Sequence, residues 1–270
     1  MKYTALSTAS IAALLLTTAA HAASIATEQF IYSAGGIAGL NGGSGFISAW
    51  RGGGSVDSVG QTYSGLATDG GGFASSGDNS GNYRDLGTSY GADGTTIFVS
   101  LLIAAQPGFG ADNPHYAGFG LFDATDSNER FYLGKTFLST NYGFVRIGGS
   151  GAGGADHISS ALVSTASTFL VAEINFLPGD DNVSLYINPT TGLAAPDGTP
   201  TTASVTDFNF DRIRIQTGFN TAAFKFDEIR IGTTYADVSP LVVPEPTSML
   251  LLGISGTALL ARRRRRAISA

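Results

Sequence analysis

The chain has 270 residues, of which 43% are hydrophobic and 13% charged, with a formal net charge of −6. This composition is that of a globular protein, and it excludes a disordered polyelectrolyte and a protein with several membrane spans. No cysteine is present, which excludes disulfides, thiolate catalysis and cysteine-ligated metal centres. Residues 23–240 carry 9 basic and 20 acidic side chains. This acidic balance argues against nucleic-acid binding, which needs clustered Lys and Arg.

The first 22 residues have the three parts of a secretory signal. Lys2 gives a basic start, residues 5–20 are apolar, and Ala20-His21-Ala22 supplies the small residues that signal peptidase accepts. We expect a signal helix over residues 1–22 that is cleaved before Ala23. The alternative is a membrane anchor, but the apolar segment is short for a membrane span.

Residues 23–240 form the body, and their pattern is that of strands. Short runs rich in Val, Ile, Phe, Tyr and Thr are separated by Gly, Asn, Asp and Pro, with no sustained helical period. The clearest strands are predicted at residues 95–104, 116–123, 130–138, 142–147, 168–177, 182–187, 211–216 and 224–231. This spacing predicts an all-β fold, a two-sheet jelly-roll sandwich.

Two features refine the sandwich. Residues 95–104 and 168–177 are apolar at nearly every position, as expected for strands covered on both faces. In residues 211–216 the alternation is strict, which places Ile213 and Ile215 in the core and Arg212 and Arg214 in water.

The body offers little that predicts catalysis. It lacks a His-Glu-x-x-His zinc motif and the Gly-x-Ser-x-Gly motif of hydrolases. Glu173 is an acid within an apolar strand, and we expect its side chain to face water or a concave sheet face. Asp227 and Glu228 are expected as surface partners of Arg212, Arg214 or Arg230. Residues 149–154 spell Gly-x-Gly-x-x-Gly, but no helix pattern follows, so a hairpin is favoured over a dinucleotide site.

The sequence leaves two kinds of ligand to consider for the body, calcium ions and sugars. Oxygen-rich loops at residues 78–82, 112–113 and 180–182 could hold Ca²⁺, although their spacing is irregular and Asx turns explain them without a metal. No other cofactor is indicated. Tyrosines beside the glycine-rich segments could stack on sugar rings, whereas Trp50 is expected in the core. The candidate sugar contacts are Tyr63, Tyr83, Tyr90 and Tyr142.

Residues 241–270 form a distinct tail with three parts. Pro244-Glu245-Pro246 is followed by an uncharged stretch over residues 247–261 and then by Arg262, Arg263, Arg264, Arg265 and Arg266. A helix of fifteen residues reaches about 22 Å, which is short of a hydrocarbon core of about 30 Å. The prolines keep the preceding peptide extended and open to a protease. The alternative is a permanent single-pass anchor.

This tail resembles the PEP-CTERM sorting signal of Gram-negative bacteria, which has the same three parts in the same order. The resemblance implies recognition of Pro244, Glu245 and Pro246 by an exosortase, a membrane protease that processes the protein during export. Contact with the membrane would then be transient. The implied destination is the cell surface or the extracellular matrix.

The body resembles concanavalin A-like and laminin-G-like jelly rolls. The resemblance rests on residues 41–46 followed by Trp50, on residues 182–189 and on residues 226–232. It implies a two-sheet fold with functions that range from sugar binding to glycan cleavage. We expect a non-catalytic structural or adhesive protein that contacts exopolysaccharide. The alternatives are a glycan hydrolase or lyase, which needs two carboxylates on one concave face, and a matrix protein that associates with itself.

Overall fold

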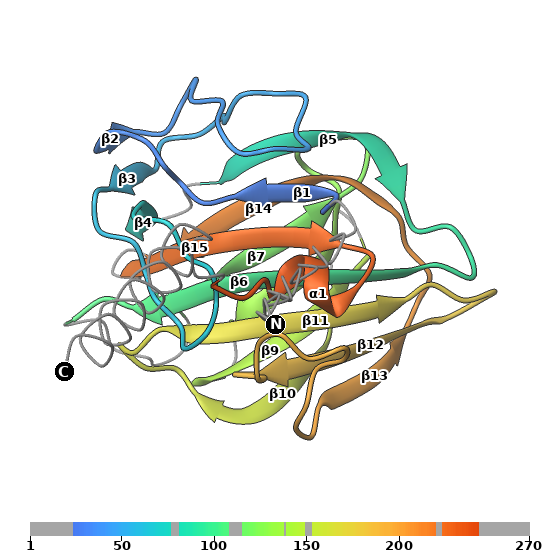
Figure 1. Cartoon of the computed structure of the whole chain (residues 1–270). Coiled ribbons are helices and arrows are strands. Elements are labelled where there is room, and N and C mark those ends of the chain that lie inside the picture. Colours follow the sequence, from blue (N-terminus) through green and yellow to red (C-terminus); the bar gives the residue numbers. More distant parts are fainter. Residues whose placement is uncertain are drawn as a thin grey trace, which may run out of the picture.

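The body is a sandwich of two antiparallel sheets, seen in the computed structural model of Figure 1. The structure describes residues 24–76, 81–107, 115–137, 139–148, 153–219 and 223–242. The larger sheet has nine strands in the order β13-β12-β11-β6-β15-β4-β3-β2, with β1 beside β15. The smaller sheet has six strands in the order β10-β9-β8-β7-β14-β5.

The strands of the nine-stranded sheet are β1 (Ala26–Glu28), β2 (Gly35–Gly36), β3 (Ser55–Asp57), β4 (Gly72–Ser76), β6 (Thr96–Ala105), β11 (Thr168–Asn175), β12 (Asp181–Ile187), β13 (Thr201–Val205) and β15 (Ala223–Gly232). Those of the six-stranded sheet are β5 (Asn82–Tyr90), β7 (Tyr116–Phe122), β8 (Glu129–Lys135), β9 (Asn141–Ile147), β10 (Gly153–Leu162) and β14 (Phe210–Gly218). Each of the eight predicted strands is found, with ends that differ by at most three residues, which confirms the all-β sandwich.

The two most apolar strands, β6 and β11, lie side by side and are covered on both faces. Alternate residues such as Leu101 and Leu170 belong to the main core between the sheets. The residues between them, such as Leu102 and Phe169, belong to a second cluster on the outer face of the nine-stranded sheet. Because side chains alternate across a strand, two apolar layers require an uninterrupted apolar sequence, as was predicted.

The second cluster is covered by a short helix, α1 (Tyr235–Val238). Its capping box is formed by Thr234 and Asp237, whose side chains each accept a backbone N–H at the first turn. Tyr235 and Val238 are buried in the cluster. Ser100 on β6 fixes the helix end by donating a hydrogen bond of 2.9 Å to the Val238 carbonyl.

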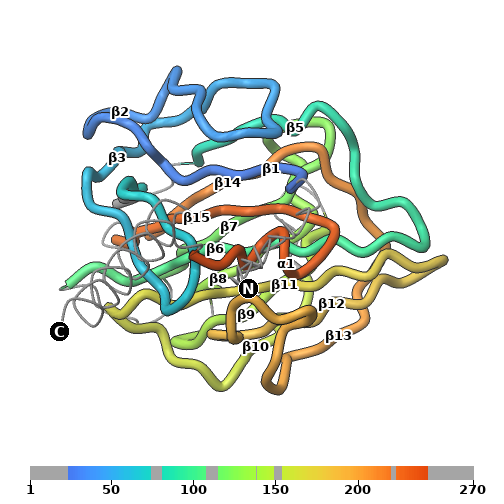
Figure 2. The backbone as a smooth tube through the Cα atoms, viewed as in Figure 1, coloured from blue at the N-terminus to red at the C-terminus, as the bar shows by residue number. Residues whose placement is uncertain are grey.

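The chain remains attached to the body after α1. Ala67 N donates to the Pro240 carbonyl at 2.8 Å, and Val242 N donates to the Gly65 carbonyl at 3.2 Å. Figure 2 shows the blue N-terminal segment beside the red C-terminal strand, in agreement with the pairing of β1 with β15. The start and the end of the body are therefore neighbours.

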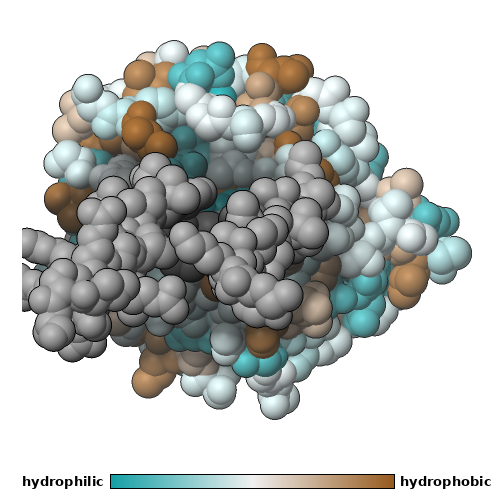
Figure 3. All heavy atoms as spheres, in the orientation of Figure 1, coloured by the Kyte–Doolittle hydropathy of each residue, from teal (hydrophilic) through white to brown (hydrophobic). Residues whose placement is uncertain are grey.

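The space-filling view of Figure 3 has the orientation of Figure 1. The described residues on this face show hydrophobic side chains in small separate patches within a mostly polar surface. Among the described residues, no helix is long and apolar enough to cross a membrane. The expected signal helix and the hydrophobic stretch of the tail lie outside those residues.

The fold confirms one local prediction, the hairpin after β9, and contradicts another, the surface position of two acids. The hairpin after β9 is confirmed, because the next element is the antiparallel strand β10 rather than a helix. The surface position of Asp227 and Glu228 is wrong, since both are 0% exposed. They lie at a bulge where the register of β15 against β6 shifts, and Glu228 pairs with Arg230 of its own strand. Both carboxylates are buried beneath the segment before β4, where Asp227 accepts a hydrogen bond from Gln61 N and Glu228 accepts one from Asp69 N.

Candidate functional site

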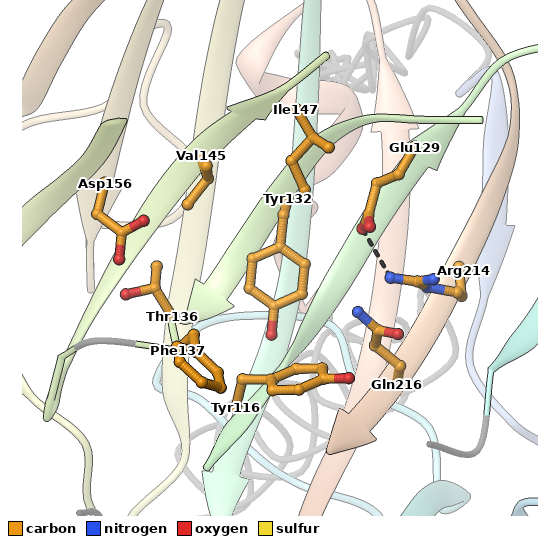
Figure 4. A pocket seen from close by; sticks show the side chains of 10 residues that line it. All are labelled: Tyr116, Glu129, Tyr132, Thr136, Phe137, Val145, Ile147, Asp156, Arg214 and Gln216. Carbon is orange, nitrogen blue, oxygen red and sulfur yellow. Dashed lines mark hydrogen bonds and ion pairs between the residues drawn. The ribbon is translucent and has the colours of Figure 1, made fainter. Parts of the chain in front are cut away.

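A cavity of about 420 Å³ lies on the open face of the six-stranded sheet, away from the core. Five neighbouring strands and the turn after β8 line it (Figure 4). Its side chains are Tyr116, Glu129, Tyr132, Thr136, Phe137, Val145, Ile147, Asp156, Arg214 and Gln216.

The strict alternation of β14 builds one wall of the cavity. Ile213 and Ile215 point into the core, so Arg214 and Gln216 must point to the opposite face. The expectation that Arg214 lies in water is wrong, because only 9% of its surface is exposed. Arg212 is also half-buried, in ion pairs with Asp126 and Asp211.

The floor of the cavity depends on a glycine in β7. Gly120 pairs with Arg214 on one side and with Tyr132 on the other. A Cβ at this position would lie 2.8 Å from Glu129 Oε1, which is too close for a real contact. The absence of a side chain at Gly120 therefore lets Glu129 lie across the strand toward β14.

Glu129 and Arg214 form a buried ion pair across this floor. Arg214 Nη2 donates to Glu129 Oε1 at 2.8 Å, as the dashed line in Figure 4 shows. The guanidinium also lies 4.4 Å from the ring centroid of Phe122, a cation–π contact. Burial raises the pKa of Glu129, and the charge of Arg214 opposes that shift. The pair thus holds two opposite charges at a fixed place in the cavity.

Tyr132 stands in the middle of the cavity and is 5% exposed. Its hydroxyl donates to the Lys135 carbonyl at 3.1 Å. Burial, followed by the charge of Glu129, raises the pKa of Tyr132 well above its ordinary value. The phenol therefore stays neutral and serves as a hydroxyl and an aromatic ring.

Three buried polar atoms of the lining have no hydrogen-bond partner among the described residues. They are Thr136 Oγ1, Asp156 Oδ2 and Arg214 Nε. A buried polar atom without a partner costs about 1–3 kcal/mol, so such groups are rare in folded proteins. Two donors, counting the threonine hydroxyl, and one carboxylate acceptor are thus offered to a ligand rich in hydroxyl groups.

The four predicted sugar contacts lie in different parts of the fold. Tyr83 on β5 is not a lining residue, but its hydroxyl lies 3.5 Å from Nη1 of Arg214, which lines the cavity. Tyr63 packs on Phe169 at the outer face of the other sheet, and Tyr90 packs on Phe210. The prediction that Tyr142 contacts sugar is wrong, because its side chain is 0% exposed and belongs to the main core. Trp50, expected in the core, is buried there.

Glu173 and the oxygen-rich loops do not meet the cavity. The Glu173 carboxylate accepts hydrogen bonds from Asn175 and Tyr186 on the outer face of the nine-stranded sheet. Asp181 accepts two backbone N–H bonds, from Leu177 and Phe208, and so has a structural role. Most of the loops at residues 78–82 and 112–113 lie outside the described residues. In the described ranges, no three His, Asp or Glu side chains gather closely enough to hold a metal ion.

Sequence reasoning missed the lining residues, although part of the signal was present. Alternation in residues 211–216 already places Arg214 and Gln216 on one face. The carboxylates Glu129 and Asp156 come from strands whose neighbours could not be read from the sequence. Figure 4 shows these two acids on opposite sides of Tyr132.

The sequence after the body matches a family model described as the PEP-CTERM protein-sorting motif, over residues 242–266. This match confirms the resemblance of the tail and marks the chain as an exported protein. All of the matched residues except Val242 lie outside those described by the structure, including Pro244, Glu245, Pro246 and the arginines Arg262, Arg263, Arg264, Arg265 and Arg266.

The body is similar in fold to binding domains of botulinum neurotoxins. For the serotype D binding domain the TM-score is 0.51 at 14% identity, covering 80% of this chain and 50% of that one. For the serotype D/C VPI 5993 binding domain the values are 0.50, 16%, 80% and 51%. The chain thus spans about half the length of these neighbours. No curated protein sequence matches the chain.

Proposed function

We propose that this protein is an exported, non-catalytic surface component whose body binds a glycan in the cavity of the six-stranded sheet. The observation that carries the proposal is the group of unpartnered buried atoms on Thr136, Asp156 and Arg214, beside aromatic rings. Pockets that orient ligands combine apolar walls with a few placed polar groups. The neighbours in fold are named as binding domains, which supports a binding role.

Binding of polysaccharides to the full chain tests this proposal. We expect Asp156→Asn and Gln216→Ala to weaken binding about tenfold, because each removes groups that face the ligand. Tyr132→Phe removes only a hydroxyl in the cavity, and Tyr186→Phe is its matched control on the other sheet. A panel of neutral and acidic polysaccharides that all fail to bind would contradict the proposal. If Tyr186→Phe weakened polysaccharide binding as much as Tyr132→Phe, the ligand would not be bound in this cavity.

Export is proposed to proceed through both ends of the chain. Residues 1–22 act as a signal peptide removed by signal peptidase, residues 23–240 form the sandwich, and residues 241–270 form the sorting tail. An exosortase-type protease then processes the tail, and the protein reaches the cell surface or the extracellular matrix of a Gram-negative bacterium. The implied partner there is exopolysaccharide.

Deletion of residues 243–270 tests the sorting step. We expect the shortened protein to lose its surface location while the body keeps its fold, because the described strands and the helix α1 all lie before residue 243. Cell fractionation and mass spectrometry of the exported form provide the measurements. An exported wild-type protein that retains its five arginines would contradict processing.

One observation favours a second function, glycan cleavage. Glu129 and Asp156 face the same cavity, and burial raises the pKa of Glu129 while Arg214 opposes that shift. Glycan hydrolysis uses such a pair of carboxylates, one of them with a raised pKa. Release of reducing ends from a bound polysaccharide, abolished in Glu129→Gln and Asp156→Asn, would support this function. A bound polysaccharide that stays uncut by the wild-type protein would leave binding alone.

A further inference from the structure

Three aromatic rings form an exposed cluster at one end of the cavity, which we name the aromatic platform. Tyr116 contacts Phe137 and Phe219 with centroid distances of 6.4 and 6.3 Å, and Phe137 lies 5.2 Å from Phe219. Phe137 is 42% exposed and Phe219 is 41% exposed. Tyr116 and Phe137 also line the cavity, so the platform continues directly into it (Figure 4).

The backbone at the platform has one strained residue, Phe219, and one close approach, at Gly218. Phe219 has a φ of +66°, a left-handed conformation that is unfavourable for a bulky residue. Its neighbour Gly218 admits no side chain, because a Cβ there would lie 2.0 Å from the ring of Tyr116. Strain of this kind persists where the surrounding structure imposes it, and it concentrates at functional sites.

A buried lysine fixes the other side of the platform. Lys135 is 0% exposed, and its ammonium group donates hydrogen bonds to the carbonyls of His115, Thr136 and Ser139. His115 precedes Tyr116, and Thr136 precedes Phe137. The lysine thus joins the two segments that present these rings, and holds them in one orientation.

The charges of the cavity lining favour neutral glycans over acidic ones. Arg214 is the one cation among the described residues of the lining, and Glu129 lies 2.8 Å from it as its counter-charge. Asp156 then leaves a net negative charge beside the ligand. A polyanionic glycan would place its carboxylates near Asp156 and Glu129, and the part of the lining that the structure describes offers no second cation to balance them, which is unfavourable in a buried site.

We infer that the cavity takes a neutral glycan, one of whose pyranose rings stacks on the aromatic platform. The apolar face of the ring covers Phe137 and Phe219, while hydroxyls of the adjoining sugar reach Gln216, Tyr132 and Asp156. Stacking on the platform would bury part of the exposed area of Phe137 and Phe219. This inference rests on the proposed glycan binding and adds the sugar class and the platform that orients it.

The test uses the full chain with two sets of hexasaccharide probes. The neutral set contains cellohexaose, laminarihexaose and mannohexaose, and the acidic probe is hexagalacturonate. We expect a neutral probe to bind at least about tenfold more tightly than the acidic one. Phe137→Ala should weaken that binding about tenfold, as expected for loss of an aromatic contact, and Phe137→Tyr should restore it. The matched control is Leu177→Ala, since Leu177 is also 42% exposed but follows β11 of the other sheet and is not among the residues that line the cavity.

The outcomes separate this inference from the proposed function. Neutral binding that Phe137→Ala leaves unchanged would overturn the platform and keep the glycan site. Tighter binding of hexagalacturonate would overturn the neutral class. Failure of every probe to bind would overturn the site itself. A dimer in analytical ultracentrifugation that Phe137→Ala dissociates, with sugar binding unaffected, would show that the platform binds a second copy of the chain and would overturn its sugar role.

Discussion

Glu28 and Arg84 form a buried ion pair that links the two sheets. Arg84 Nη1 lies 2.5 Å from Glu28 Oε2, and each side chain is 1% exposed. Glu28 is the last residue of β1 in the nine-stranded sheet, and Arg84 lies in β5 of the six-stranded sheet. The carboxylate also accepts hydrogen bonds from Phe30 N, the Tyr32 hydroxyl and Trp50 Nε1. This network binds residues 28–50 to β5, the edge strand of the six-stranded sheet.

Loss of the arginine should therefore destabilise the fold strongly. We expect Arg84→Met to lower the free energy of unfolding by about 3–5 kcal/mol, because it leaves the Glu28 carboxylate buried without a cation. Urea denaturation measures the change. Arg51→Met is the control, since Arg51 forms half-exposed ion pairs and should cost about 1 kcal/mol or less. Equal losses in the two variants would contradict a special role for the buried pair.

Asp227 should make stability depend on pH. Burial, chiefly, raises the pKa of Asp227 to about 8, and the charge of Glu228 adds to the shift while Arg230 opposes it. An acid whose folded pKa exceeds its unfolded value binds its proton more tightly when folded. Its contribution to the free energy of unfolding is thus present at acidic pH and falls as the pH rises from about 4 to about 8.

The slope of that decline has an upper limit of about 1.4 kcal/mol per pH unit for one group. Asp227→Asn cannot ionise, so we expect its stability to change less over this interval. Chemical denaturation at a series of pH values measures both proteins. Wild-type stability that rises steadily between pH 5 and pH 8 would contradict a raised pKa at Asp227.

Lys135 should be essential to the stability of the turn that carries Phe137. Lys135→Met removes hydrogen bonds to three carbonyl groups, and we expect a loss of at least about 2 kcal/mol in the free energy of unfolding. Thermal and urea denaturation measure it. The control is Lys225→Met, because Lys225 makes a half-exposed ion pair with Asp57 and should cost about 1 kcal/mol or less. A smaller loss at Lys135 than at Lys225 would refute this assignment.

Gly120→Ala should alter the cavity while the protein remains folded. The new Cβ would meet the ends of two side chains, Phe122 at 2.7 Å and Glu129 at 2.8 Å, which can move aside. Displacement of Glu129 breaks its pair with Arg214, so we expect weaker binding of the neutral hexasaccharides. Gly36→Ala is the control, because no atom lies within 4 Å of its Cβ position. Unchanged binding in Gly120→Ala would show that the floor of the cavity does not matter to the ligand.

The strands with strong apolar patterns could be predicted from the sequence. In β6 and β11 the two apolar layers leave few polar positions, and in β14 Ile213 and Ile215 alternate with polar residues. The strand β5 could not be found in this way. Its inward positions include Asn82 and Arg84, whose burial depends on partners such as Glu28 that are distant in the sequence. A polar network in the interior erases the alternation by which strands are recognised.

The site was harder to predict than the fold. Arg214 alternates with isoleucines, which correctly gives its face but not its environment. Its partner Glu129 is 85 positions away and reaches it across Gly120. The register of β14, β7 and β8 brings them together, and strand order of this kind is not contained in local patterns. Tyr142 was misplaced for a related reason, because the sequence does not show which face of β9 its ring occupies.

The attachment of residues 240–242 to residues 65–67 has a consequence for maturation. These hydrogen bonds end at Val242, which is also the first residue of the sorting motif. A peptidase that cuts downstream of Val242 would leave the described strands, the helix α1 and these hydrogen bonds within the remaining chain. Processing of the proposed kind would therefore act on a body whose described core lies entirely upstream of the cut.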